Sequence, residues 1–410
     1  MTKKSDAPAI RFKGFSDAWE QRKLGDIVER VVRKNTNNES SLPLTISAQY
    51  GLVDQITYFN NRVASRDVSN YYLVLNGEFA YNKSTSDRFP FGAVKRLDLY
   101  EKGVLSTLYI VFSIKNQSEI DSDYLTVFFD TDRWHKGVSE RAAEGARNHG
   151  LLNISADDFF DIDIFLPRHK EEQVAIGSYL RHLDNLITLH QRKFEKLTNV
   201  KKSMLEKMFP QNGSSYPEIR FKGFTDPWEQ RKLGDIGKAR SGVGFPDADQ
   251  GGVTGVPFFK VSDMNLDGNE NEMIVANNYV TAEQIADHRW SPITELPAIF
   301  FAKVGAAVML NRKRLCRFPF LLDNNTMAYS LSPTKCDADF AKALFGTVDL
   351  TSLVQVGALP SYNAGDVESM GIYLPSLFEQ EQIGAFFKLL DNLITLHQRQ
   401  LFFIQPRIFL

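Results

Sequence analysis

The chain is poor in cysteine, and this excludes two classes of protein. Its 410 residues include only two cysteines, Cys316 and Cys336. Two thiols can form neither the disulfide framework of a small secreted protein nor a four-cysteine zinc site. We therefore expect a reducing, cytoplasmic setting and no bound metal.

The chain also lacks an excess of either charge and has no long apolar run. Lysine and arginine number 48 against 50 aspartates and glutamates, so a uniformly basic nucleic-acid binder is excluded and any DNA site must be a local patch. The longest apolar stretch, residues 296–310, is interrupted by Lys303 and is too short to cross a bilayer. The N-terminal lysines are not followed by an apolar segment of the signal-peptide kind. We expect no membrane association.

The chain has ample material for folded cores. Hydrophobic residues make up 43% of it, too many for a disordered protein, and 26 glycines and 16 prolines are too few for a collagen-like one. At roughly 150 residues per domain, the length predicts two or three domains.

An internal repeat determines how these domains are organised. Residues 10–27 read IRFKGFSDAWEQRKLGDI and residues 219–236 read IRFKGFTDPWEQRKLGDI, which differ at only two positions. A second match joins residues 183–192 to residues 390–399, where LDNLITLHQR recurs unchanged. Two long matches at nearly the same offset indicate two tandem half-chains of one design.

Each half ends in a predicted long helix with a heptad pattern. The first seam is formed by Ile176, Leu180, Leu183, Ile187, His190, Phe194, Leu197, Lys201, Met204 and Met208. The second is formed by Ile383, Phe387, Leu390, Ile394, His397, Leu401 and Ile404, and it ends early because Pro406 stops a regular helix. Such seams need a partner, so we predict an antiparallel coiled coil within the chain and a pseudo-two-fold repeat. The histidines are more typical of residues that set the register than of metal ligands or pH switches.

Between the repeated signatures the two halves diverge, which is typical of one scaffold that presents two different binding surfaces. We predict an α+β protein with two tandem domains of mixed helix and strand structure, residues 1–166 and 213–374. The two long helices occupy residues 167–212 and 375–410, and the second is apparently truncated.

The divergent inserts contain the polar residues that suit nucleic acid. Residues 81–96 form a polar loop followed by a basic pair, and Asn, Lys, Ser and Arg are side chains that bond bases and phosphates. Residues 303–317 carry five cationic residues and no acidic one. A solvated hairpin loop and a solvated basic turn remain the alternatives for these two segments.

Motifs for catalysis are missing. The chain has no GxxxxGK[ST], no HExxH, no cysteine and histidine ligand cluster, and no Asn/Asp-Pro-Pro-aromatic motif of amino-methyltransferases. We therefore predict a binding protein with no catalytic residues of its own.

The repeated motifs resemble a known family. RFKGF[ST]DxWEQRKLGD opens each half, RAAEGARNHGLLNIS or VGALPSYNAGD closes each variable domain, and Leu-Pro precedes EEQ or EQEQ and then DNLITLHQR. Together these motifs resemble the specificity subunit of a Type I restriction-modification system, over essentially the whole chain. The resemblance implies two target-recognition domains that each read one half of a split site in double-stranded DNA. It also implies that the two helices act as a ruler and dock two modification subunits.

The resemblance further implies that this chain binds no cofactor and catalyses nothing. S-adenosylmethionine for adenine methylation is expected on the modification (methyltransferase) subunits, and ATP and magnesium on the restriction (motor-nuclease) subunits. The candidate DNA contacts are Lys83, Ser84, Arg88, Lys95, Arg96, Arg147, Asn148 and His149 in the first half and Lys260, Ser262, Asn265, Lys303, Asn311, Arg312, Lys313 and Arg314 in the second. The alternative is a non-enzymatic coiled-coil assembly protein whose inserts bind protein partners.

Overall fold

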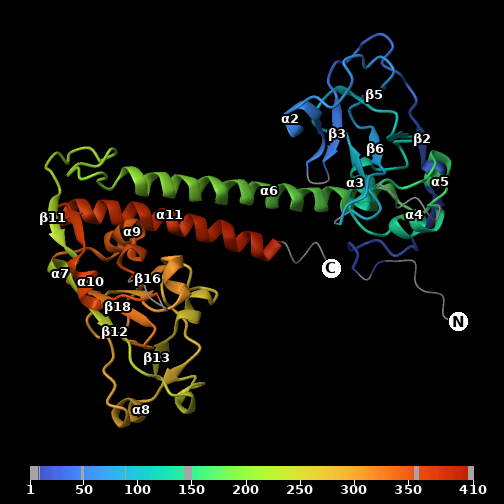
Figure 1. The fold of residues 1–410 in the computed structure, drawn as a ribbon. Helices are drawn as coiled ribbons and strands as arrows, with labels where there is room; N and C mark the ends of the chain where they lie inside the picture. Colours follow the sequence, from blue (N-terminus) through green and yellow to red (C-terminus); the bar gives the residue numbers. More distant parts are fainter. Residues whose placement is uncertain are drawn as a thin grey trace. The chain divides into compact units, whose positions relative to one another are not determined.

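The computed structural model describes residues 8, 10–47, 50–87, 89–142, 150–354 and 360–404. The chain forms two compact units, residues 1–186 and 187–410 (Figure 1). The division between them falls inside the first long helix, whereas the sequence places domain boundaries at the ends of that helix.

The first unit is built around a four-stranded sheet whose strands bury both faces. The strand order is β2 (Val28–Arg30), β9 (Ile110–Ile114), β6 (Phe79–Asn82) and β7 (Ala93–Arg96), all antiparallel. Side chains alternate along a strand, so Phe79 and Tyr81 enter one core while Ala80 enters another. The larger core is aromatic and includes Phe112 and Phe159, which are fully buried.

Short elements complete this unit. A separate pair joins β1 (Glu20–Lys23) to β10 (Asp163–Leu166), and two further pairs join β3 (Leu44–Ser47) to β4 (Gly51–Asp54) and β5 (Tyr72–Leu75) to β8 (Lys102–Leu105). The short helices are α1 (Leu24–Ile27), α2 (Gln55–Phe59), α3 (Ser122–Phe129), α4 (His135–Arg141) and α5 (Ala156–Phe160).

The second unit repeats this frame around a different insert. Its frame pair joins β11 (Glu229–Lys232) to β19 (Gly371–Leu374), in the same antiparallel sense as β1 and β10. Its main sheet has the order β12 (Gly237–Ser241), β18 (Thr326–Leu331), β15 (Ala298–Ala302) and β16 (Lys313–Cys316). A three-stranded sheet has the order β14 (Tyr279–Val280), β13 (Val256–Phe259) and β17 (Leu321–Leu322).

Helical segments cover these sheets. They are α7 (Leu233–Ile236), α8 (Ala282–Asp287), α9 (Ala338–Thr347), α10 (Ala364–Ser369) and the short 3-10 turns η1 (Asp247–Asp249), η2 (Val261–Asn265), η3 (Ala306–Leu310) and η4 (Leu350–Leu353). In β15, Ile299 and Phe301 enter one core while Ala298 and Phe300 enter another, which is the same double-faced burial as in the first unit.

Two long helices follow the frame strands: α6 (Lys170–Lys207) with 38 residues and α11 (Leu377–Ile404) with 28. Within the second unit, the part of α6 from Ile187 onward runs beside α11 (Figure 1). The Nδ1 atoms of His190 and His397 lie 2.9 Å apart, and Lys201 contacts Asp391. Position increases along α6 as it decreases along α11, so the predicted antiparallel pairing is confirmed and the repeated histidines face each other.

The heptad seam of α11 contacts both the partner helix and the core of its own domain. Ile383, Phe387 and Leu390 all belong to the main core of the second unit. The first turns of this seam therefore have a second role beside the predicted helix pairing, because these apolar side chains also bury against their own domain.

The start of each long helix is held by a buried carboxylate. Glu172, in the first turn of α6, is fully buried and accepts hydrogen bonds from Arg11 Nε at 2.6 Å and Arg11 Nη2 at 2.7 Å. The indole Nε1 of Trp19 donates to the same carboxylate at 3.4 Å. The residues of the opening RFKGF and WEQ motifs thus anchor the helix that comes about 150 residues later.

The second half repeats this anchor with equivalent residues. Arg220 donates to both oxygens of the buried Glu379 at 2.7 Å, and Trp228 Nε1 donates at 3.3 Å. The same arginine, tryptophan and glutamate therefore attach the start of the long helix to the opening motif in both halves.

A glutamine and a glycine complete each anchor. Gln173 Oε1 accepts from the Asp121 backbone amide at 2.9 Å, and Gln380 Oε1 accepts from that of Asp337 at 3.0 Å. A Cβ on Gly177 would lie 2.6 Å from the Tyr124 backbone nitrogen, and one on Gly384 would lie 2.6 Å from that of Phe340. Only glycine allows each long helix to approach the shorter helix this closely.

Candidate nucleic-acid interface

The predicted residues of the first insert occupy two kinds of environment. Ser84 is exposed beside a β-bridge to Leu151, and Lys83 Nζ donates to the Ile154 carbonyl at 3.4 Å. These two residues follow β6, and their predicted DNA contact stays a prediction. Four further candidates lie outside the described residues: Arg88, Arg147, Asn148 and His149.

The basic pair on β7 is already neutralised by acidic side chains. Lys95 Nζ lies 2.5 Å from Asp130 Oδ1. Arg96, whose side chain is only 10% exposed, bonds Asp98 at 2.6 Å and Asp123 at 2.8 Å. Burial opposes the charged guanidinium, but the two carboxylates outweigh it and raise the pKa of Arg96. This pair attaches β7 to its surroundings, and its predicted DNA contact stays a prediction.

The second insert places its basic run on the edge strand β16. Lys313 pairs with Phe301 and Arg314 with Phe300, so the alternation of the strand directs the two cations to opposite faces. Lys313 Nζ donates to the Val348 carbonyl at 2.6 Å, and Arg314 Nε donates to the Asn269 carbonyl at 2.7 Å. Their acceptors are backbone oxygens, in contrast to the carboxylates that bind Lys95 and Arg96.

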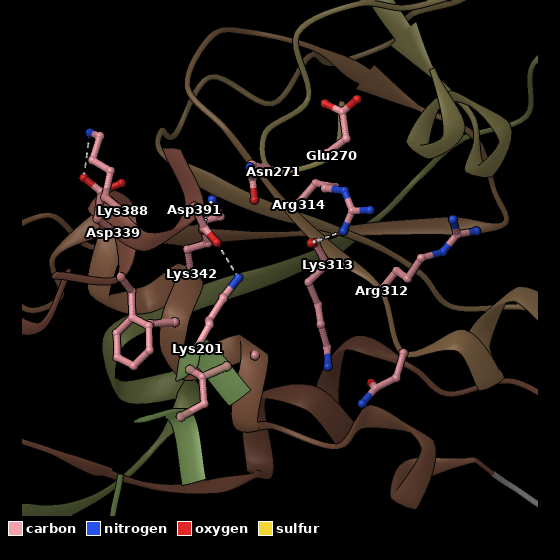
Figure 2. Close-up of a pocket in the computed structure, with 15 residues that line it drawn as sticks. Lys201, Glu270, Asn271, Arg312, Lys313, Arg314, Asp339, Lys342, Lys388 and Asp391 are labelled. Carbon is pink, nitrogen blue, oxygen red and sulfur yellow. Dashed lines mark hydrogen bonds and ion pairs between the residues drawn. The ribbon is translucent and has the colours of Figure 1, made fainter. Parts of the chain in front are cut away.

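A basic cleft opens where this strand meets the long helices. Its volume is about 260 Å³, and it lies between α6, α9, α11 and β16 (Figure 2). The cationic lining residues are Lys201, Arg312, Lys313, Arg314, Lys342 and Lys388, and the acidic ones are Glu270, Asp339 and Asp391. Six cationic and three acidic side chains leave an excess of positive charge.

Asp391 organises one wall of the cleft. Its Oδ1 lies 2.5 Å from Lys201 Nζ of α6, and its Oδ2 lies 2.7 Å from Lys342 Nζ of α9. The carboxylate of Asp391 is 7% exposed, and burial lowers the pKa of Lys342. We did not predict either Lys201 or Asp391 as part of a site from the sequence. The available signals were that Lys201 is a polar residue in the heptad seam and that Asp391 belongs to the repeated DNLITLHQR.

The remaining candidates of the second half divide between the cleft and other places. Asn311 lines the cleft in a left-handed conformation with φ 49°, and its Oδ1 accepts from the Leu350 amide at 3.1 Å. Asn265 is exposed and accepts from Arg312 Nη1 at 2.7 Å. Three others do not line the cleft: Lys260, which begins the η2 turn and bonds Gln250, the exposed Ser262, and the half-buried Lys303.

One family model matches both halves of the chain. The model of the type I restriction modification DNA specificity domain matches the chain twice, at residues 16–199 and 225–402. The chain belongs to this family. Both halves of this specificity subunit are thus DNA specificity domains, and the resemblance seen in the repeated motifs is confirmed.

Two curated relatives agree with this assignment, and a solved structure shares the fold. The chain is 24% identical over 407 residues to a putative type I restriction enzyme MjaX specificity subunit of Methanocaldococcus jannaschii, covering 93% of this chain and 89% of that protein. It is 22% identical to the MjaVIII specificity subunit of the same organism, covering 93% and 88%. The crystal structure of the S subunit from M. genitalium shares the fold, with a TM-score of 0.58 at 13% identity over 97% of this chain and 95% of that one.

The predicted α+β fold with a tandem repeat and long helices is confirmed by these comparisons. Among the described residues, no helix is long and apolar enough to cross a membrane. The same residues contain no group of three or more side chains that could hold a metal ion.

Proposed function

We propose that each domain of this specificity subunit reads one part of a split site in double-stranded DNA, while the helix pair sets the spacing. The observation that carries this proposal is the contrast between a repeated frame and two unlike inserts. β1 and β10 are matched by β11 and β19, and Glu172 is matched by Glu379. The strands outside the main sheets differ, because the first insert has the pairs β3-β4 and β5-β8 and the second has the three-stranded sheet β14-β13-β17. A shared frame with different inserts suits the reading of two different sequences.

We propose in addition that two modification subunits and the restriction subunits assemble on this chain in the cytoplasm. The two frame copies support this, because equivalent surfaces can dock two copies of one partner. In this arrangement the partners bind S-adenosylmethionine, ATP and magnesium, and the specificity subunit contributes recognition without catalysis.

The direct test is a methylation map. The chain is co-expressed with its modification subunit, and methyladenine is located across the host genome. We expect one motif composed of two short sequences separated by a fixed gap. Methylation without a shared motif, or with a single uninterrupted motif, would contradict the proposal.

An exchange of inserts tests the independence of the two domains. Residues 30–150 are replaced by the insert of a relative, and residues 238–355 are replaced in a matched second variant. We expect each exchange to alter one half of the motif and to leave the other half and the gap unchanged. A change in both halves from one exchange would refute separate reading.

A further inference from the structure

Arg312, just before β16, and Lys313 and Arg314, on β16, form no ion pair within the described part of the chain. Lys313 and Arg314 donate to the backbone carbonyls of Val348 and Asn269, and Arg312 donates to the amide oxygen of Asn265. No carboxylate of the described residues lies within 4.0 Å of any of these three cations. In addition, the buried Nε of Arg312 has no hydrogen-bond acceptor among them.

Lys313 and Arg314 have also lost much of their hydration. Burial lowers the pKa of Lys313 to about 8, and burial also lowers the pKa of Arg314. A charge removed from water requires a compensating charge or a full set of hydrogen bonds. Carbonyl oxygens supply only part of that compensation, so this wall of the cleft is electrostatically suited to an anion.

Three carboxylates farther than 4.0 Å away compensate the cations of β16 only in part, because burial outweighs the effect of Glu270 and Asp391 on the pKa of Arg314 and that of Asp349 on the pKa of Lys313. Asp391 is shared between Lys201 and Lys342, and Asp339 is shared between Lys388 and Arg317. Both acids are therefore already engaged by two cations each. Figure 2 shows Lys201 and Asp391 on one side of the cleft and Lys313 and Arg314 on the other.

We propose that this basic cleft binds a phosphate group of the DNA backbone, held between Lys201 on α6 and the cations of β16. The inference rests on the DNA-reading function proposed above. It assigns a ligand to a site beside the main sheet of the second unit. A phosphate is a compact anion, and the cleft volume of about 260 Å³ is far above the roughly 10–15 Å³ that admits one water molecule by the same measure.

The position of the cleft determines what such a contact does. Lys201 belongs to the long helix and Arg312 precedes a strand of the recognition domain, so one phosphate contacts both elements of the second unit. Phosphate contacts position a protein on the duplex but carry no base information directly. The contact therefore strengthens binding and aligns the domain without changing which sequence is read.

The test compares two neighbouring lysines of one helix. Lys201 lines the cleft, whereas Lys202 is exposed and does not, so Lys201→Gln and Lys202→Gln remove the same charge from adjacent positions. The full chain in complex with its modification subunits is titrated with a duplex that carries the mapped motif, over a series of salt concentrations. We expect Lys201→Gln to reduce the log-log salt slope by about one and to weaken all bound sequences alike.

A second variant removes a cation from the opposite wall. Arg312→Gln leaves every ion pair of the described residues intact, so it retains the Lys201 and Asp391 contact. We expect it to reduce the salt slope as Lys201→Gln does, with the methylated motif unchanged in both. If both variants have normal thermal midpoints and the same salt slope as Lys202→Gln, the phosphate inference is overturned. The proposed reading of a split site is not affected by that result. Failure of the unaltered complex to prefer its motif would overturn both.

Inorganic phosphate separates the two possible sources of the anion. The thermal midpoint of the isolated full chain is compared in sodium phosphate and in sodium chloride at equal ionic strength. A phosphate-specific rise that Lys201→Gln loses and Lys202→Gln keeps, together with the altered DNA salt slope, supports the proposal. The same rise with an unaltered DNA salt slope assigns the cleft to free phosphate and overturns the DNA assignment.

Discussion

The two halves of the molecule share one frame but differ in how the cations of their inserts are paired. In the first half, Lys95 and Arg96 bind aspartates, and Arg181 of α6 joins Arg96 on Asp123. In the second half, Arg312, Lys313 and Arg314 meet only backbone carbonyls and one side-chain amide. Equivalent positions in a repeated scaffold therefore do not imply equivalent binding surfaces, because the insert decides which cations remain available.

The long helices show the same contrast. Asp184 and Asp391 occupy the same place in the repeated LDNLITLHQR, yet Asp184 is exposed and Asp391 is buried between two lysines. The reason is the environment that each unit supplies: Lys342 comes from α9 and Lys201 from α6.

A buried aromatic on α11 should contribute more to stability than its counterpart on α6. Phe387 is 2% exposed in the main core of the second unit, whereas Leu180, at the equivalent repeat position, is only partly buried. We expect Phe387→Ala to lower the free energy of unfolding by about 3–5 kcal/mol and Leu180→Ala by less. Urea denaturation, with hydrogen exchange to assign each transition to one half, measures both values. Equal losses would show that the two helices are packed alike.

The anchoring glycines should be equally important in both halves. A Cβ at Gly177 or Gly384 would lie 2.6 Å from a backbone nitrogen of the packed helix. We expect Gly177→Ala and Gly384→Ala each to cost about 1–3 kcal/mol, because the helices must separate. Gly371→Ala is the control, since its Cβ would meet nothing within 4 Å. Loss of stability in one half alone would contradict a shared anchor.

The two repeated aspartates should differ when neutralised. Asp391→Asn removes the charge shared by Lys201 and Lys342, and we expect a loss of about 1–3 kcal/mol because hydrogen bonds to charged groups weaken. Asp184 is exposed and has no ion pair among the described residues, so Asp184→Asn should change stability by less than about 0.5 kcal/mol. Thermal denaturation of both variants at neutral pH gives the comparison.

The smallest expected effect is a loss of stability in mild acid that involves one histidine in each half. Burial lowers the pKa of His135, and burial together with His190 and Lys193 lowers the pKa of His397 below the usual 6.5. A folded-state pKa below the unfolded value means that the unfolded chain binds more protons, so stability falls as pH drops below about 6.5. We expect the thermal midpoint to decrease by a few degrees at most.

The variants His135→Gln and His397→Gln assign this pH dependence to the two halves. Each should flatten the dependence of its own unit below about pH 6.5 and leave that of the other unit unchanged. An unchanged pH profile in both variants would show that other groups cause the loss.

Much of the architecture followed from local patterns. The repeat at residues 10–27 and 219–236 predicted two copies of one frame, and the heptads predicted an antiparallel helix pair. In the structure, His190 and His397 meet in that pair. These predictions succeeded because identical segments adopt similar local structure and because a helix with an apolar stripe must bury it. The same reasoning did not reveal that Ile383 and Phe387 also serve the core of their domain, since periodicity shows which face is buried but not against what.

The candidate contacts were harder to predict for a physical reason. A basic residue in a divergent insert has the same sequence signature whether it pairs with a carboxylate, as Arg96 does, or lacks such a pair, as Arg314 does. That difference depends on residues far away in the chain, such as Asp123 and Asn269, whose positions only the folded sheets determine.

The sequence by itself determined the duplicated design of the protein, its two long helices and its family, because those features are written as contiguous, repeated residues. Only the tertiary structure decided where the positive charge remains uncompensated. The basic cleft combines Lys201, Lys342 and Asp391 with a strand more than a hundred residues away from Lys201. Electrostatic compensation acts through space over a few ångströms, and separation along the chain does not reveal it.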